Sequence, residues 1–323
     1  MNYPKYHIGP MSKNVVDAIL EYTEETGNVI GIIPSRRQIE HSGGYVNNWT
    51  TKTFYAYINR RLPITRDHSG PSQGINKDDG YASLQHDCKY FNMIHIDPWI
   101  QYPEYADGLK WTIDMINFCY KQNQKLEYEI GTEESIRKFE AFELDRLMIN
   151  LRAKLPVHIF NRIKCLVVQS GTSLKGNTNT GKYSKDRLKD MIEVAGIWNL
   201  YSKEHNGDYI STSLIKEKFD LGLDAINIAP EFGQIETKTY LDKIKQNSEL
   251  FGILYKICYI SNKWKKWVDK DFDPIQQKEE LINICGHYIL SDSDFLLKVK
   301  SKFTNIDLEI KNNIKIKLQE LHG

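Results

Sequence analysis

Eight short, apolar segments of β-rich composition recur along the first 230 residues, and this recurrence constrains the fold more than any other feature. Between most of them lie stretches whose apolar residues repeat at helical spacing. Strands that alternate with helices predict a parallel sheet with right-handed crossovers. The segments lie at residues 5–9, 28–34, 61–67, 91–97, 126–132, 164–170, 198–205 and 224–229.

The number of these units favours one architecture. Eight strand-and-helix units before residue 230 predict an α/β fold with a closed (β/α)8 TIM barrel. An open, doubly wound sheet is the alternative, because a count of strands does not prove closure. Residues 236–323 have a helical pattern throughout and no convincing strand. We therefore expect a TIM-barrel catalytic domain over residues 1–235, followed by the final barrel helices and a helical extension over residues 236–323.

Charge and cysteine content exclude several classes of protein. The chain has 43 basic and 42 acidic residues, a net charge of +1, which gives no electrostatic footprint for nucleic acid or an anionic membrane. Its five cysteines are far apart and form no CxxC pair, which indicates reduced, buried thiols. No segment approaches the roughly 18 apolar residues of a membrane helix, and no signal-peptide core begins the sequence. We expect a soluble, cytoplasmic protein.

Polar groups follow three of the predicted strands, at residues 66–71, 131–133 and 204–209. In a TIM barrel, the carboxyl ends of the strands hold the catalytic groups. His68 and His205 can offer neutral imidazole nitrogens to a divalent ion, while Asp67 and Glu133 can bind the ion or move protons. Together these groups predict a metal-assisted site. Taken one at a time, each is more typical of an ordinary polar loop than of a metal site.

Three further positions have a functional and a structural interpretation. His95 and Asp97 share one face of their strand; Asp97, at its end, is the better candidate for the pocket, whereas His95 is typical of a core residue. The Gln169 amide can orient sugar hydroxyls or be satisfied by neighbouring backbone. Arg36 and Arg37 suit a phosphate group, or are solvated loop charges.

Three common catalytic motifs are missing from the sequence. It contains no GxSxG elbow, no HExxH helix and no glycine fingerprint of a Rossmann fold. This argues against serine hydrolysis, zincin chemistry and dinucleotide binding.

The pair Asn206-Gly207 is an ordinary turn, or a turn whose backbone N–H groups face a phosphate.

Six segments resemble, in the same order, the accessory-subunit family of class II tagatose-bisphosphate aldolases. Residues 67–71 read Asp-His-Ser-Gly-Pro where that family has Asp-His-Leu-Gly-Pro, and residues 94–97 read Ile-His-Ile-Asp for Ile-His-Leu-Asp. Gly-Thr-Glu at 131–133 matches directly, and Val-Val-Gln-Ser-Gly at 167–171 resembles Val-Val-Gln-Pro-Gly. The other two are residues 38–45, which end in Gly-Gly-Tyr, and residues 204–209, which have one residue fewer before the histidine than the family's Glu-Ala-His-Ser-Thr-Asp-Tyr.

The resemblance implies a TIM barrel related to class II fructose-bisphosphate aldolases, which use a divalent metal, and to ketose 4-epimerases. On that pattern Asp67 transfers a proton, and His68 and His205 bind the metal. A third histidine of the aldolases has no counterpart here, because Gln169 occupies that region. Glu133 would then complete a site of two histidines and one carboxylate for Zn²⁺, with Mn²⁺, Co²⁺ or Ni²⁺ as alternatives.

Our hypothesis is therefore a metal-dependent aldolase or 4-epimerase that acts on a ketose or ketose phosphate by retro-aldol chemistry through an enediolate. The predicted catalytic residues are Asp67, Glu133 and Asp97. Residues 35–37 are more basic than in the family, and Ala-Pro-Glu at 229–231 replaces its Gly-Pro-Ala type, so we expect a substrate other than tagatose bisphosphate. The predicted substrate-binding residues are Arg36, Arg37, Gln38, Gln169, Asn206, Gly207 and Asp208.

Two other functions stay open from the sequence. One is a non-catalytic accessory subunit that stabilises a class II sugar-bisphosphate aldolase, which the missing third histidine favours. The other is a sugar-binding or regulatory barrel without turnover. The expected partners are a small sugar or sugar phosphate, and either further copies of the chain or a related aldolase subunit.

Overall fold

The computed structural model describes residues 3–323 and contains an eight-stranded parallel barrel. Each segment predicted as a strand overlaps one observed strand, so the prediction of a TIM barrel is confirmed. The barrel strands are β1 (Tyr6–Ile8), β2 (Gly31–Ile32), β3 (Thr65–Ser69), β4 (Met93–Ile96), β5 (Glu127–Ile130), β6 (Ile163–Val168), β9 (Tyr201–Glu204) and β10 (Ala225–Ile228).

The barrel is nearly closed. Its strands are hydrogen-bonded in the order β2-β1-β10-β9-β6-β5-β4-β3, and all neighbouring pairs are parallel. The two end strands meet through parallel bridges that pair Ile32 with Ile64 and Ser35 with Asp67. The Asp67 N–H donates to the Pro34 carbonyl at 3.0 Å. An open, doubly wound sheet is therefore excluded.

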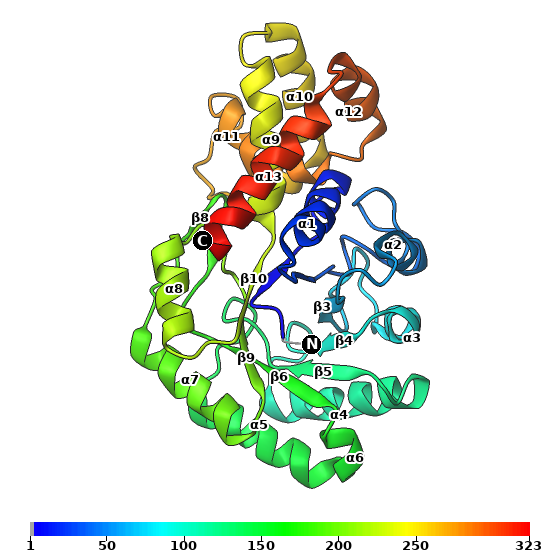
Figure 1. The fold of residues 1–323 in the computed structure, drawn as a ribbon, viewed down its shortest axis with the longest axis vertical. Helices are drawn as coiled ribbons and strands as arrows, with labels where there is room; N and C mark the ends of the chain where they lie inside the picture. The colour runs from blue at the N-terminus through cyan, green and yellow to red at the C-terminus, as the bar shows by residue number, and fades with distance from the viewer. Residues whose placement is uncertain (1–2) are drawn as a thin grey trace.

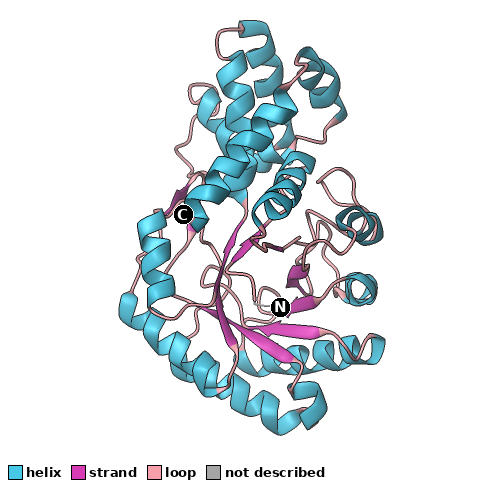
Figure 2. Ribbon diagram, viewed as in Figure 1, coloured by secondary structure: helices cyan, strands magenta, loops and turns pink. Residues whose placement is uncertain are grey.

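Helices surround the strands, which lie inside (Figure 2). In α1, the Ser12 side chain accepts the N–H of Val15 at the first turn, and Gly27 ends the helix with a φ of 73°. The barrel helices are α1 (Lys13–Thr26), α2 (Thr51–Ile58), α3 (Tyr81–Tyr90), α4 (Tyr105–Gln122), α5 (Ala141–Lys154), α6 (Val157–Phe160), α7 (Lys185–Ile197), α8 (Thr212–Asp220) and α9 (Pro230–Ile244). A small hairpin of β7 (Leu174–Lys175) and β8 (Thr178–Asn179) follows β6.

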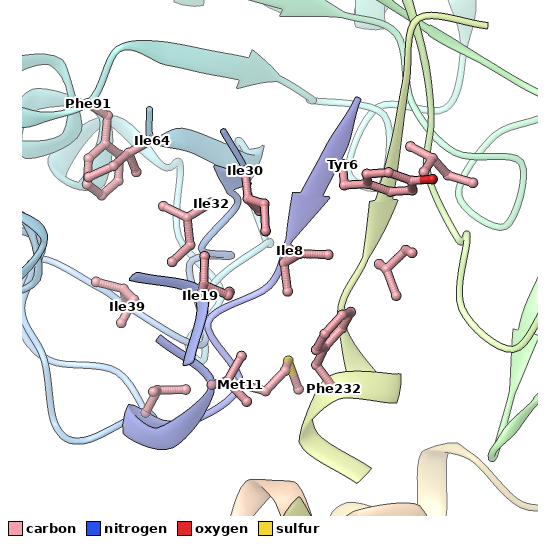
Figure 3. Packing of buried hydrophobic residues seen from close by; sticks show 14 of the residues in the cluster. Tyr6, Ile8, Met11, Ile19, Ile30, Ile32, Ile39, Ile64, Phe91 and Phe232 are labelled. Carbon is pink, nitrogen blue, oxygen red and sulfur yellow. The ribbon is translucent and has the colours of Figure 1, made fainter. Parts of the chain in front are cut away.

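The core lies between the barrel and its helices. Ile8 of β1 is fully buried among apolar side chains that include Ile19 of α1 and Phe232 of α9 (Figure 3). The apolar residues Ile136, Phe139, Phe142 and Leu147 repeat at helical spacing in the sequence, which predicts one helix, but only the last two lie in α5. Residues 137–140 form a loop before α5, and Phe142 is 69% exposed. The Gln169 amide fixes this loop by bonding its backbone, so periodic apolar residues here do not mark a helix.

A helical extension follows the barrel, and no strand occurs after β10 in the described residues. It projects from one side of the barrel (Figure 1), while its last helix packs back on α1 and α9. The expected boundary at residue 235 falls inside α9. The extension comprises α10 (Ser248–Ser261), η1 (Lys263–Lys266), α11 (Lys278–Cys285), η2 (Gly286–Tyr288), α12 (Ser293–Lys298), η3 (Lys300–Lys302) and α13 (Ile306–His322).

Two properties expected from composition are visible in the structure. All five cysteines are buried and unpaired. Among the helices of residues 3–323, none combines the length and apolar character required to cross a membrane.

Candidate metal centre

A cavity of about 300 Å³ lies at the carboxyl ends of the barrel strands. This volume is at the lower end of the range for small-molecule pockets, roughly 300–1,000 Å³. Asp67 and His68 near the end of β3, Glu133 after β5, and His205 after β9 all line it. The three strand ends singled out in the sequence therefore meet in one pocket.

The backbone at the end of β3 turns two neighbouring side chains toward this pocket. Adjacent residues of a regular strand point to opposite faces. Here the β3–β4 register shifts between Arg66 and Ser69, and His68 has a φ of 44°. A positive φ at a non-glycine residue costs about 1–3 kcal/mol and is concentrated at functional sites. This local distortion lets Asp67 and His68 face the cavity together.

Three histidines gather around Asp67, and each has one ring nitrogen fixed by an acceptor. His68 Nδ1 donates to Asp97 Oδ2 at 2.7 Å, and His205 Nε2 donates to Glu129 Oε1 at 2.8 Å. His95 Nε2 donates to the carbonyl of Gly131 at 2.9 Å. Because a carboxylate or carbonyl can only accept, the second nitrogen of each neutral ring is left as a lone-pair donor. Metal-binding histidines in proteins have this arrangement.

The free nitrogens converge on one point. His68 Nε2, His95 Nδ1 and His205 Nδ1 lie 3.8, 3.8 and 3.7 Å from Asp67 Oδ1. One ligand atom from each of these four residues lies within 4.8 Å of the others. Tetrahedral ligands at ~2.0–2.1 Å from Zn²⁺ are separated by roughly 3.3–3.5 Å. The donor set therefore fits a divalent ion after small movements. His95 Nδ1 also accepts the His68 backbone N–H at 3.2 Å, so its lone pair is less available.

Charge at the cluster also suits a cation. Burial opposes charge on His68, but Asp67 and then Asp97 raise its pKa to about 10. Burial likewise opposes the charge of Asp67, yet His68 and the other histidines hold its pKa well below the usual range. Burial lowers the pKa of His205, which keeps that ring neutral. The site favours a positive charge beside Asp67, and either a proton or a divalent cation can supply it.

A buried ion pair supports the cluster from behind. Lys203 of β9 forms a salt bridge with Glu129 of β5, and both side chains are at most 1% exposed. Burial alone would raise the pKa of Glu129, but Lys203 holds it well below the ordinary value. The carboxylate therefore stays ionised and keeps the proton of His205 on Nε2. We did not assign Glu129 or Lys203 to the site, although a charge inside a strand with buried neighbours is a detectable signal.

The predicted catalytic residues differ in position. Asp67 is central, and Glu133 Oε2 lies 3.8 Å from His68 Nε2, at the edge of the cluster. Asp97 is fully buried behind His68 and does not line the cavity. Its carboxylate also accepts from Gln73 at 3.0 Å and Thr132 at 3.1 Å, so it orients the imidazole. His95, which we interpreted as a core residue, belongs to the cluster.

The predicted substrate-binding residues divide into two groups. Arg37, Gln38, Asn206 and Asp208 line the cavity. The other three, Arg36, Gln169 and Gly207, are absent from its lining. The Arg36 guanidinium is buried and bonds Glu40, Asp78 and the Gly70 carbonyl. The Gln169 amide is occupied by the loop before α5, and the Gly207 N–H donates to Asn227 O at 2.9 Å.

The extension completes the cavity wall opposite the barrel loops. Lys266, Trp267, His287 and Tyr288 line the cavity together with Asn227 of β10. Sequence reasoning placed none of these five in the site, because a long-range contact between a barrel mouth and a distant helical segment leaves no local pattern.

Comparison with known proteins gives the fold and no closer relationship. No family model matches the chain, and no curated protein does. A structure described as a probable tagatose 6 phosphate kinase from Sinorhizobium meliloti 1021 has a TM-score of 0.76 at 15% identity, and the match covers 99% of both chains. The YdjI aldolase from Escherichia coli K12 has a TM-score of 0.56 at 12% identity over 93% of both chains.

A third neighbour extends the same pattern. The fructose-bisphosphate aldolase of Campylobacter jejuni has a TM-score of 0.57 at 10% identity and covers 99% of this chain and 90% of its own. At such identities the likeness establishes the fold alone. The chain therefore has the (β/α)8 fold and is similar in structure to proteins described as aldolases, consistent with the family that its strand-end motifs resemble.

Proposed function

We propose that this protein is a divalent-metal-dependent enzyme that makes or breaks a carbon–carbon bond of a ketose or ketose phosphate, as an aldolase or a 4-epimerase. The observation that carries the proposal is the convergence of three imidazole nitrogens, each with its partner nitrogen already bonded, on the Asp67 carboxylate. A scaffold without chemistry has no need of this arrangement. The shared fold with class II aldolases supports the same chemical class.

His68, His205 and His95 would hold the ion, with Asp67 or Glu133 as an oxygen ligand. Such an ion supplies Lewis-acid polarisation of a substrate carbonyl and stabilises the negative charge that develops on its oxygen. Asp97 and Glu129 keep His68 and His205 oriented, and the buried charge of Lys203 keeps Glu129 ionised.

Asp67 is the group best placed to move the substrate proton. It lines the cavity, and its side chain is 15% exposed to the pocket. Removal of a hydroxyl proton by Asp67 starts cleavage of the adjacent carbon–carbon bond. Release of the two fragments gives aldol cleavage, whereas recombination on the opposite carbonyl face gives the epimer. Glu133, at the cluster edge, is the candidate for returning a proton.

In the sequence, the accessory-subunit alternative was favoured because Gln169 occupies the region where the aldolases have a third metal-binding histidine. His95 provides a third imidazole from a different strand, which weakens that reason. On the substrate side, Arg37, Gln38, Asn206 and Asp208 remain as binding groups because they line the cavity.

Metal analysis of the purified chain, followed by a screen of ketoses and ketose phosphates by NMR, tests the proposal. We expect a stoichiometric divalent ion and either cleavage fragments or a 4-epimer. Asp67→Asn should abolish turnover, and Asp114→Asn, at an exposed site in α4, is the matched control. Full turnover by Asp67→Asn, or a chain that binds no divalent ion, would contradict this function.

A further inference from the structure

Two buried side chains that line the cavity, one from the extension and one from the barrel, have polar atoms with no hydrogen-bond partner in the described residues. His287 of η2 is 2% exposed, and neither ring nitrogen has a hydrogen-bond partner within residues 3–323. Asn227 of β10 is 4% exposed, and neither its amide oxygen nor its nitrogen is bonded. Buried polar groups are almost always satisfied, and each unmade bond costs about 1–3 kcal/mol. Both side chains line the same cavity, so a ligand there would satisfy them.

Two cations line the same cavity without a counterion. Lys266 and Arg37 take part in no salt bridge among the described residues. Arg37 uses one guanidinium N–H for the Gly74 carbonyl at 3.2 Å, which leaves the rest of its fork free. Both residues are exposed to solvent where they line the cavity. Two like charges that line one cavity attract an anion to that part of it.

Aromatic rings hold this cationic end in place. The ammonium of Lys266 lies 4.3 Å from the ring centre of Trp267 and 5.0 Å from that of Tyr288. Trp267 Nε1 donates to the hydroxyl of Tyr288 at 3.2 Å. Tyr288 also packs on Tyr45, a barrel-loop residue, with 5.1 Å between ring centres. The extension and the barrel loops therefore share one aromatic cluster at the pocket.

Two glycines allow η2 to pack closely against α9 of the barrel. A Cβ atom on Gly233 of α9 would lie 2.7 Å from the Cβ of His287, and one on Gly286 would lie 2.3 Å from Thr237 Cγ2. Only glycine fits at either position without a shift of the neighbouring residues. This contact fixes His287 at the pocket wall rather than leaving it on a mobile segment.

We propose that the extension and the barrel together form a recognition subsite for the anionic, hydroxylated end of the substrate, in the same cavity as the metal cluster. Its four polar residues are Arg37, Asn227, Lys266 and His287. The inference rests on the proposed function for the identity of the bond that reacts, but it makes the extension the specificity-determining part of the site. The ligand class is a polyhydroxylated anion, in which the charge is a phosphate or a carboxylate.

Calorimetric titration of the full-length protein with inorganic phosphate and, separately, with D-gluconate tests this subsite. We expect Lys266→Met and Arg37→Met to weaken the preferred anion by roughly tenfold or more, as loss of a charge-assisted bond does. Lys270→Met, a nearby exposed lysine that makes no salt bridge, is the control and should bind like the parent. Tighter binding of phosphate identifies a sugar phosphate, and tighter binding of gluconate identifies a sugar acid.

His287→Phe separates recognition from folding. Phenylalanine keeps the ring volume and removes both unbonded nitrogens, so the melting temperature should stay the same or rise while gluconate binding weakens. Anion binding that is absent from the parent, or equal in the Lys266→Met, Arg37→Met and Lys270→Met variants, would overturn the subsite. Mn²⁺ affinity, measured on the same samples, should be unchanged by all of these variants. A parent protein that binds no Mn²⁺ would instead refute the metal-dependent function. Failure of the subsite and failure of the proposed function are therefore distinguishable.

Discussion

The two ends of the pocket differ in whether their polar groups already have hydrogen-bond partners in the protein. At the barrel end, His68, His95 and His205 each have one nitrogen bonded, and the remaining donors converge on Asp67. At the extension end, the polar atoms of His287 and Asn227 have no partner in the described chain. A metal ion needs ligands that are already oriented, because every misplaced donor reduces its affinity. A substrate that enters and leaves needs groups whose bonding capacity is still available.

The largest effect should follow loss of a ligand at the metal end. We expect His68→Ala to remove the divalent ion and abolish turnover while phosphate binding at the extension end persists. Elemental analysis of the purified variant measures the first effect, and calorimetry measures the second. His158→Ala, at an exposed position in α6, should keep both properties. If His68→Ala kept its metal, the cluster would not be the binding site.

Asp97→Asn should have an intermediate effect, because it changes the orientation of a ligand and leaves the ligand itself. The Asp97 carboxylate accepts from His68 Nδ1, Gln73 and Thr132, and an uncharged amide would accept these bonds more weakly. Loss of a partner of this kind typically reduces metal affinity by about 10–100-fold. Competition with a chelator of known affinity measures the change. An unaltered metal affinity would show that Asp97 stabilises the surrounding loops and does not orient His68 for the ion.

The extension end can be displaced without removing any of its polar groups. In Gly286→Ala, the new methyl group meets Thr237 Cγ2 at 2.3 Å, so η2 must move away from α9. We expect a loss of about 1–3 kcal/mol in the free energy of unfolding and weaker anion binding, with metal affinity retained. Gly252→Ala in α10 is the control, since nothing lies within 4 Å of its Cβ. There alanine should stabilise the helix by about 1 kcal/mol. Equal anion binding by both variants would separate η2 from the subsite.

The same contrast explains what could be predicted from sequence. The barrel and its strand-end motifs follow from periodicity, because each strand and the polar residues after it are adjacent in the chain. Asp67, His68, Glu133 and His205 were found in this way. His95 was interpreted as a core residue, because its own strand does not show what it faces. Only the folded barrel shows that its imidazole lies beside those of His68 and His205.

The residues that remained unpredicted depend on long-range packing. Arg36 matches a phosphate-binding pattern in sequence, yet Glu40 and Asp78 occupy its guanidinium in the folded chain. Lys266 and His287 meet the pocket only because η1 and η2 fold back on the barrel mouth. No local pattern encodes that contact, although the glycines that permit it are visible once the structure is known.

A smaller effect tests whether the two regions fold as one unit. Glu236 of α9 is buried where α9 meets α1, and it accepts hydrogen bonds from Ser12 and Asn14, which also bonds Asp307 of α13. Burial raises the pKa of Glu236 to about 6, from an ordinary value of 4.5. The folded state therefore favours the protonated form. The stability that this preference contributes is complete below about pH 4.5 and is lost as the pH rises through 6, a loss of about 2 kcal/mol.

Glu236→Gln should remove this part of the pH dependence, so that the free energy of unfolding changes less between pH 4.5 and 7 than in the parent. Chemical denaturation, followed by both far-UV circular dichroism and tryptophan fluorescence, measures it. Glu249→Gln, an exposed glutamate of α10, should leave the dependence intact. Because tryptophans lie both in the barrel and in the extension, coincident transitions from the two probes would mean that the protein unfolds as one unit. Transitions in the parent that differ between the two probes would instead mean that parts of the protein unfold separately.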